Sequence, residues 1–73
     1  MAVTKIRAPT AGTVVSITAP AGTRVAKDQE LLVFESMKLE IPVESPADGT
    51  VARVYVAAGQ EFQENDVLVD LAT

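Results

Sequence analysis

The stretch Ala8-Pro9-Thr10-Ala11-Gly12-Thr13-Val14 recurs 37 positions later as Ser45-Pro46-Ala47-Asp48-Gly49-Thr50-Val51. The same offset, without a gap, matches three further pairs: Ala21 with Ala58, Gly22 with Gly59 and Leu31 with Leu68. Seven identical pairs on one offset, with Pro and Gly among them, indicate an internal repeat. Two copies are too few for a solenoid. The repeat therefore predicts one domain with pseudo-two-fold symmetry, whose halves are residues 6–36 and 43–73.

Both halves have the composition of β-strands. Segments rich in β-branched and aliphatic residues cover positions 14–17, 31–34, 39–43, 51–56 and 67–71. Pro or Gly lies between all of these segments except 31–34 and 39–43, and no window of eleven residues keeps a helical apolar stripe free of both. Apolar residues three apart, at positions 14 and 17 and again at 51 and 54, indicate a β-bulge or a change of face in each half. We expect an all-β fold, a small flattened sandwich or barrel.

The two long connectors also match. Residues 21–29 and 58–66 are polar apart from one large apolar residue in each, Val25 or Phe62. A lone apolar side chain in a polar loop is most often buried, so we expect each to close one end of the core.

Composition excludes several classes of protein. The 73 residues include neither Cys nor His, which excludes disulfides, common zinc sites and His-dependent catalytic triads, and we expect no metal. A net charge of −4 disfavours binding to nucleic acid. The longest apolar run is five residues, 54–58, far short of the roughly 20 that span a membrane. The N-terminal residues form no apolar signal segment, and we expect a cytoplasmic location.

A hairpin is predicted between the two halves, near the pseudo-two-fold axis. Strand-like residues 31–34 and 39–43 flank Ser36-Met37-Lys38-Leu39, so Lys38 is expected at the tip of the turn. This turn lacks the Gly, Asn or Asp that favour two-residue hairpins, and it places the apolar Met37 in a solvated position. Local rules tend to fail at functional sites. Spacing alone leaves two interpretations open, an ordinary surface turn and a hairpin for modification or docking.

The hairpin residues 35–40, Glu35-Ser36-Met37-Lys38-Leu39-Glu40, resemble the biotin-attachment motif of biotin carboxyl carrier domains, which commonly reads Ala-Met-Lys-Met. The resemblance extends over nearly the whole chain and includes Ile6-Arg7-Ala8-Pro9, Gly12-Thr13-Val14, Gly49-Thr50-Val51, Gly59, Asn65-Asp66 and Val67-Leu68. It implies a flattened barrel of two four-stranded antiparallel sheets, with the lysine on a tight hairpin. Ser36 and Leu39 depart from the usual Ala and Met, and the first half has no insertion resembling the "thumb" loop of some bacterial carriers.

The resemblance implies that biotin is joined to Lys38 by an amide bond. In this family a biotin protein ligase activates biotin with ATP, a biotin carboxylase loads a carboxyl group, and a carboxyltransferase delivers it. The carrier itself catalyses nothing. The flanking residues Glu35, Ser36, Met37, Leu39 and Glu40 would then be recognised by the ligase. Met37 is also compatible with packing over the barrel edge, and the two glutamates are compatible with ordinary solvated positions.

Three alternatives compete with a biotin carrier. A lipoyl carrier of 2-oxo acid dehydrogenases shares the fold implied by the resemblance, but lipoyl domains usually have an acidic residue where Met37 stands. An unmodified hairpin module has no reason to keep Met37-Lys38 at its tip. A small nucleic-acid-binding barrel is disfavoured by the acidic charge and by the small number of aromatic residues.

Overall fold

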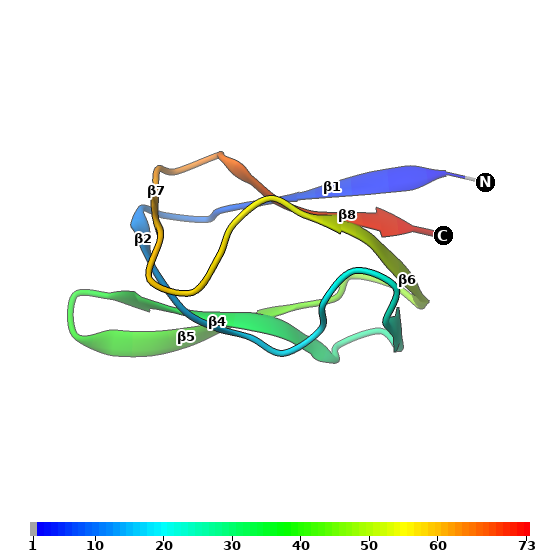
Figure 1. The fold of residues 1–73 in the computed structure, drawn as a ribbon, viewed down its shortest axis with the longest axis horizontal. Coiled ribbons are helices and arrows are strands. Elements are labelled where there is room, and N and C mark those ends of the chain that lie inside the picture. Colours follow the sequence, from blue (N-terminus) through cyan, green and yellow to red (C-terminus); the bar gives the residue numbers. More distant parts are fainter. Residues whose placement is uncertain (1) are drawn as a thin grey trace.

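A computed structural model describes residues 2–73 and consists of eight β-strands (Figure 1). The strands are β1 (Val3–Arg7), β2 (Gly12–Ile17), β3 (Arg24–Val25), β4 (Glu30–Ser36), β5 (Leu39–Glu44), β6 (Gly49–Val54), β7 (Glu61–Phe62) and β8 (Val67–Ala72). They form two four-stranded antiparallel sheets, in the orders β1-β8-β6-β3 and β5-β4-β2-β7. The expected all-β fold of two such sheets is confirmed. Residues 2–73 contain no helix long and apolar enough to cross a membrane.

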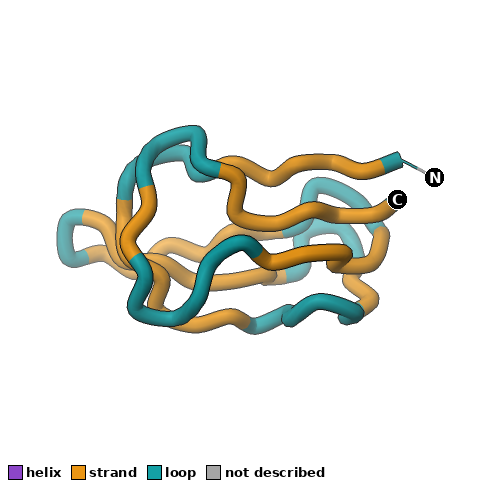
Figure 2. Tube along the Cα trace, turned by 45° about the horizontal axis from the view of Figure 1, so that its top comes forward, coloured by secondary structure: helices purple, strands orange, loops and turns teal. Residues whose placement is uncertain are grey.

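The internal repeat appears in the strand bounds. Shifting β2 by 37 positions gives the bounds of β6, and the same shift converts β3 into β7. Each sheet takes two strands from each half of the chain, so neither half forms a sheet by itself. A loop of each half is also hydrogen-bonded to a strand of the other half. The Gly22 N–H donates to the Val51 carbonyl and the Gly59 N–H donates to the Val14 carbonyl, both at 2.7 Å. The two halves therefore share one core. Figure 2 shows the strands that surround this core and the loops that join them.

The core lies between the sheets and is built from the inward side chains of the strands. Its largest fully buried members are Phe34, Leu31, Leu32, Leu68 and Leu71. Val25 and Phe62 are 2% and 3% exposed, which confirms that each connector contributes one buried residue. The Phe62 ring meets Phe34 edge to face, with 5.3 Å between ring centroids. This contact fixes the short strand β7 against β4.

Of the two explanations that the apolar spacing left open, a β-bulge is the one present in both halves. The pairing register shifts between Val14 and Ser16 in β2 and between Val51 and Arg53 in β6. A bulge adds one unpaired residue and increases local twist. It explains why the apolar spacing in these strands is three instead of two.

Three features differ from the sequence expectations. The strand predicted over residues 51–56 ends at Val54, and none of the predicted strand segments covers β1 or the short strands β3 and β7. The tip of the β4-β5 hairpin lies at one end of a molecule 35 Å long, and the chain ends lie at the other (Figure 1). The expectation that the tip lies near the symmetry axis was therefore wrong. A shift of 37 positions relates residue 36 to residue 73 and residue 2 to residue 39. The pseudo-two-fold axis therefore exchanges the hairpin with the chain ends, which lie at opposite ends of the molecule, and passes between them.

Candidate functional site

The tip of the hairpin formed by β4 and β5 is supported by regularly paired strand residues. Phe34 pairs with Ile41, Glu35 with Glu40 and Ser36 with Leu39. Phe34 is completely buried, so the strand is anchored only a few residues before the turn. Since side chains alternate along a strand, the two glutamates face away from the core side on which Phe34 lies. The turn thus protrudes from an ordered ladder.

The turn itself has an unusual backbone for its residues. Met37 and Lys38 have φ values of 52° and 66°, and together they are the two central residues between Ser36 and Leu39. Two successive positive φ values define a type I′ turn, which normally contains Gly, Asn or Asp. For other residues this conformation costs roughly 1 kcal/mol or more each. The poor turn chemistry seen in the sequence is therefore real strain at the tip.

The tip residues are turned toward solvent. Met37 is 93% exposed and Leu39 is 66% exposed. Met37 therefore does not pack over the barrel edge. Lys38 is also exposed, and the one ion pair formed among residues 2–73 joins Lys5 to Asp70, so the Lys38 amine has no carboxylate partner there. An exposed amine on a fixed backbone, between two apolar neighbours, fits a group that a modifying enzyme must reach.

A row of polar side chains crosses the sheet just behind the tip. Glu40, Glu35, Thr13 and Glu61 are successive cross-strand partners on β5, β4, β2 and β7. Directly opposed like charges destabilise a sheet. Glu35 and Glu40 are directly opposed, so this pair lowers the stability of the hairpin, whereas Thr13 separates Glu35 from Glu61.

Charge differs between the two sheets. The strands of β5-β4-β2-β7 carry five acidic residues and no basic one: Glu30, Glu35, Glu40, Glu44 and Glu61. The strands of the other sheet carry four basic residues against a single acidic one, namely Lys5, Arg7, Arg24 and Arg53 against Asp70. The hairpin thus extends from the acidic side of the molecule.

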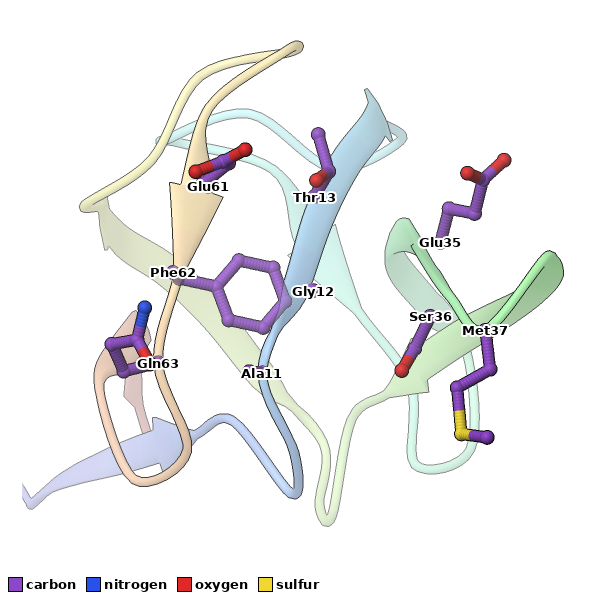
Figure 3. A pocket seen from close by; sticks show the side chains of 9 residues that line it. All are labelled: Ala11, Gly12, Thr13, Glu35, Ser36, Met37, Glu61, Phe62 and Gln63. Atoms are coloured by element: carbon purple, nitrogen blue, oxygen red, sulfur yellow. The ribbon is translucent and has the colours of Figure 1, made fainter.

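A hollow of about 350 Å³ opens beside the tip (Figure 3). Three short segments line it, residues 11–13, 35–37 and 61–63. Only residues 35–37 belong to the hairpin, and the sequence did not indicate that the other two segments lie beside it. Nothing in their local pattern marks them, because only the pairing of β2 with both β4 and β7 brings them together.

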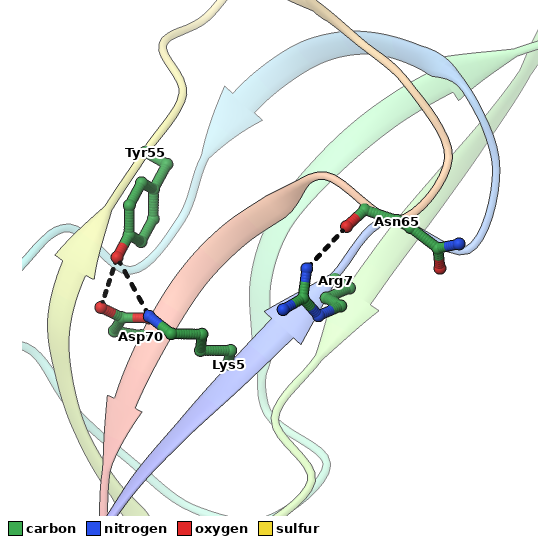
Figure 4. Close-up of polar contacts among 5 residues, drawn as sticks. All are labelled: Lys5, Arg7, Tyr55, Asn65 and Asp70. Carbon is green, nitrogen blue, oxygen red and sulfur yellow. Dashed lines mark hydrogen bonds and ion pairs between the residues drawn. The ribbon is translucent and has the colours of Figure 1, made fainter.

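A second polar cluster lies on the opposite sheet (Figure 4). The Tyr55 hydroxyl donates to Asp70 Oδ2 at 2.6 Å, and Lys5 Nζ lies 3.2 Å from Asp70 Oδ1. The Arg53 guanidinium lies 4.4 Å from the centroid of the Tyr55 ring. The Tyr55 hydrogen bond and Lys5 lower the pKa of Asp70, and hydrogen bonds from Lys5 to Asp70 and Tyr55 raise the pKa of Lys5. In this cluster the Lys5 amine is engaged by Asp70 and Tyr55, and its raised pKa keeps it protonated, so it is a poor nucleophile and its contacts stabilise the sheet.

The structure brings all the sequence-predicted residues, 35–40, together in one hairpin. Their roles in attachment and recognition follow in the proposal below. Among residues 2–73, no group of three His, Cys, Asp or Glu side chains could hold a metal ion.

Comparison with known proteins matches most of the chain, including the hairpin, to one family. The model of the biotin/lipoyl family described as "Biotin-requiring enzyme" matches residues 3–71. Pyruvate carboxylase of Bacillus subtilis is 39% identical over 66 residues, which are 90% of this chain and 6% of that protein. The biotin/lipoyl attachment protein of the same organism is 37% identical over 62 residues, or 85% of each chain.

Solved structures agree with this assignment. A single-chain, multi-domain long-chain acyl-CoA carboxylase matches with a TM-score of 0.87 and 35% identity, over 97% of this chain and 7% of that one. The lipoyl domain of the 2-oxoglutarate dehydrogenase complex from Azotobacter vinelandii matches with a TM-score of 0.82 and 25% identity, over 94% and 95% of the two chains.

The chain spans only about 6% of the length of the pyruvate carboxylases it matches. The shared segment is nevertheless a complete two-sheet unit that carries the Met37-Lys38 hairpin. From this fold, this hairpin and the match over residues 3–71, the chain belongs to the biotin/lipoyl attachment family and is a carrier domain homologous to the biotin domains of carboxylases.

Proposed function

We propose that this protein is a biotin carboxyl carrier and that biotin is attached to Lys38. The observation that carries the proposal is the Met37-Lys38 pair at the exposed tip of a type I′ turn, on a hairpin anchored by Phe34. When bound, biotin supplies a ring nitrogen that accepts and gives up a carboxyl group. The family description "Biotin-requiring enzyme" supports this cofactor.

Lys38 would act as the nucleophile for attachment. Its neutral amine attacks the activated carboxyl of biotin, an amide bond forms, the leaving group departs with its electron pair, and the amine loses a proton. The positive charge of Lys38 is lost, which changes the formal net charge from −4 to −5. Because the amine already points into solvent, the ligase would not have to unfold the hairpin.

The other hairpin residues would serve recognition. Met37 and Leu39 present apolar surface on either side of the lysine, and Glu35 and Glu40 place negative charge behind it. Apolar side chains bury well in a partner's pocket, and charges guide orientation. We infer that a biotin protein ligase reads these residues together with Ser36.

The domain would then carry its cargo between two partner enzymes, a biotin carboxylase and a carboxyltransferase, without catalysing either reaction. A flexible arm on a rigid base raises the local concentration of the cargo at each partner site. The ordered ladder of β4 and β5 provides that base.

Lipoate is the second candidate cofactor. The structural match to a lipoyl domain over almost its whole length supports lipoate as the alternative cofactor. Met37 argues against it, because the lipoyl domains described above usually have an acidic residue directly before the lysine.

Intact-mass measurement tests the proposal. The chain is incubated with ATP, biotin and a biotin protein ligase, and in parallel with lipoate and a lipoyl ligase. Wild type is compared with Lys38→Arg, which keeps the charge and leaves Lys5 and Lys27 unchanged. One biotinyl group on wild type and none on the variant supports the proposal. Modification by the lipoyl ligase alone, or by neither enzyme, would refute it.

A further inference from the structure

The hollow beside the hairpin arises where two paired strands separate. β2 and β4 pair as far as Thr13 with Glu35, and beyond that pair Gly12 pairs only with Phe62 of β7. The ends of β2 and β4 thus leave a space of about 350 Å³. The space is shallow and open to solvent, so it suits the edge of a single small ring system and does not enclose a ligand.

The lining combines hydrogen-bonding groups with a small apolar part. Thr13 is the cross-strand partner of both Glu35 and Glu61, so one hydroxyl stands between two carboxylates. In Figure 3 these three side chains point to the same side, and the Phe62 ring points toward Gly12. Ser36 and Met37 line the hollow from the hairpin.

The charge of the lining selects the kind of group that fits. No lysine or arginine lines the hollow, and neither Glu35 nor Glu61 forms an ion pair with any of residues 2–73. The carboxylates are therefore available as acceptors, and they repel an anion. Both glutamates are exposed and hydrated, so a neutral ring with N–H donors can replace the water bound to them, whereas a ring without donors cannot.

We propose that the hollow is a docking site for the neutral cyclic urea of the biotin arm on Lys38. This inference rests on the proposed function. Urea N–H groups would donate to the carboxylates on the rim, and the Ser36 hydroxyl would donate to the urea carbonyl. Met37 both lines the hollow and precedes Lys38, so the arm begins at its edge. Tethering raises the local concentration, so even a weak contact is populated.

The test uses the full chain, uniformly labelled with ¹⁵N, before and after biotinylation by a ligase. Intact mass first establishes that Lys38 carries biotin. Amide spectra are then expected to show shifts at Gly12, Thr13, Phe62 and Gln63, which are remote from Lys38 in sequence. Contacts between the ring protons and the Met37 methyl or Phe62 ring should appear as NOEs in the wild-type protein.

Two matched variants add a control. Ala11→Trp places a bulky side chain at an exposed position that lines the hollow, and Ala52→Trp makes the same change at an exposed position on the opposite sheet. We expect the remote shifts to disappear in the first variant and to persist in the second. Should Ala11→Trp not fold, the NOEs in wild type decide the matter alone.

The outcomes separate the two proposals. Failure to gain the mass of biotin overturns the proposed function. A biotinylated chain whose shifts stay within residues 35–40, with no NOE to Met37 or Phe62, overturns only the docking site. Shifts that survive Ala11→Trp in a folded protein also overturn it.

Discussion

Replacement of Met37 by Asn should stabilise the protein while impairing its modification. Met37 has a φ of 52°, in the left-handed region. That region costs an ordinary side chain roughly 1–2 kcal/mol, and Asn tolerates it much better. Since Met37 is 93% exposed, its removal sacrifices almost no packing. We expect the free energy of unfolding to rise by about 1 kcal/mol, which raises Tm by about 4–8 °C in a domain of this size.

Thermal and urea unfolding of wild type, Met37→Asn and Met37→Gln measure this effect. Gln resembles Met in length and has no preference for the left-handed region, so its stability should stay within about 0.5 kcal/mol of wild type. The rate of biotinylation by a ligase is followed for the same three proteins, and we expect the Asn variant to be slower. An Asn variant no more stable than the Gln variant would show that the turn is not strained, and the reasoning would fail.

Three further predictions concern the body of the domain. Gly12→Ala would bring a Cβ to 2.7 Å from Phe34 Cδ2 and 2.8 Å from the Glu35 carbonyl oxygen, so urea unfolding should show a loss of about 1–3 kcal/mol. Phe62→Ala removes a buried ring, and the same assay should show a loss of about 3–5 kcal/mol, with a smaller loss contradicting its role in the core. The folded-state pKa of Asp70 lies below 3.8, so its charge stabilises the protein above pH 3.8 and ceases to do so as the pH falls through the folded value. The difference in Tm between wild type and Asp70→Asn should therefore shrink in acid, and a difference independent of pH would contradict this.

The strained turn connects the stability of this protein with its proposed function. Met37 and Lys38 adopt a conformation that Asn-Gly would adopt more readily, and the rest of the hairpin is regular. A sequence selected for stability alone would place Asn or Gly here. Retaining Met and Lys at this cost is consistent with a tip whose side chains are read by another protein.

The sequence by itself determined five of the eight strands, the turns between them and the hairpin. Periodicity and β-branched residues predicted five of the strands, and the spacing of three predicted a bulge or a change of face in each half, because these properties depend on near neighbours along the chain. The 37-residue offset predicted the symmetry. Lys38 could be singled out because the attachment motif is one continuous segment.

Only the tertiary structure decided which strands pair and what surrounds the tip. Local pattern does not choose a partner, since any strand with one apolar face can pair with several others. Each sheet combines strands from both halves, which local pattern does not predict. With this pairing, the hairpin tip lies at the end of the molecule opposite the termini. Three segments that are separate in the sequence line the hollow. Lys5 is hydrogen-bonded to Asp70, which is 65 positions away in the sequence. Such sites depend on long-range register, which no local segment of the chain encodes.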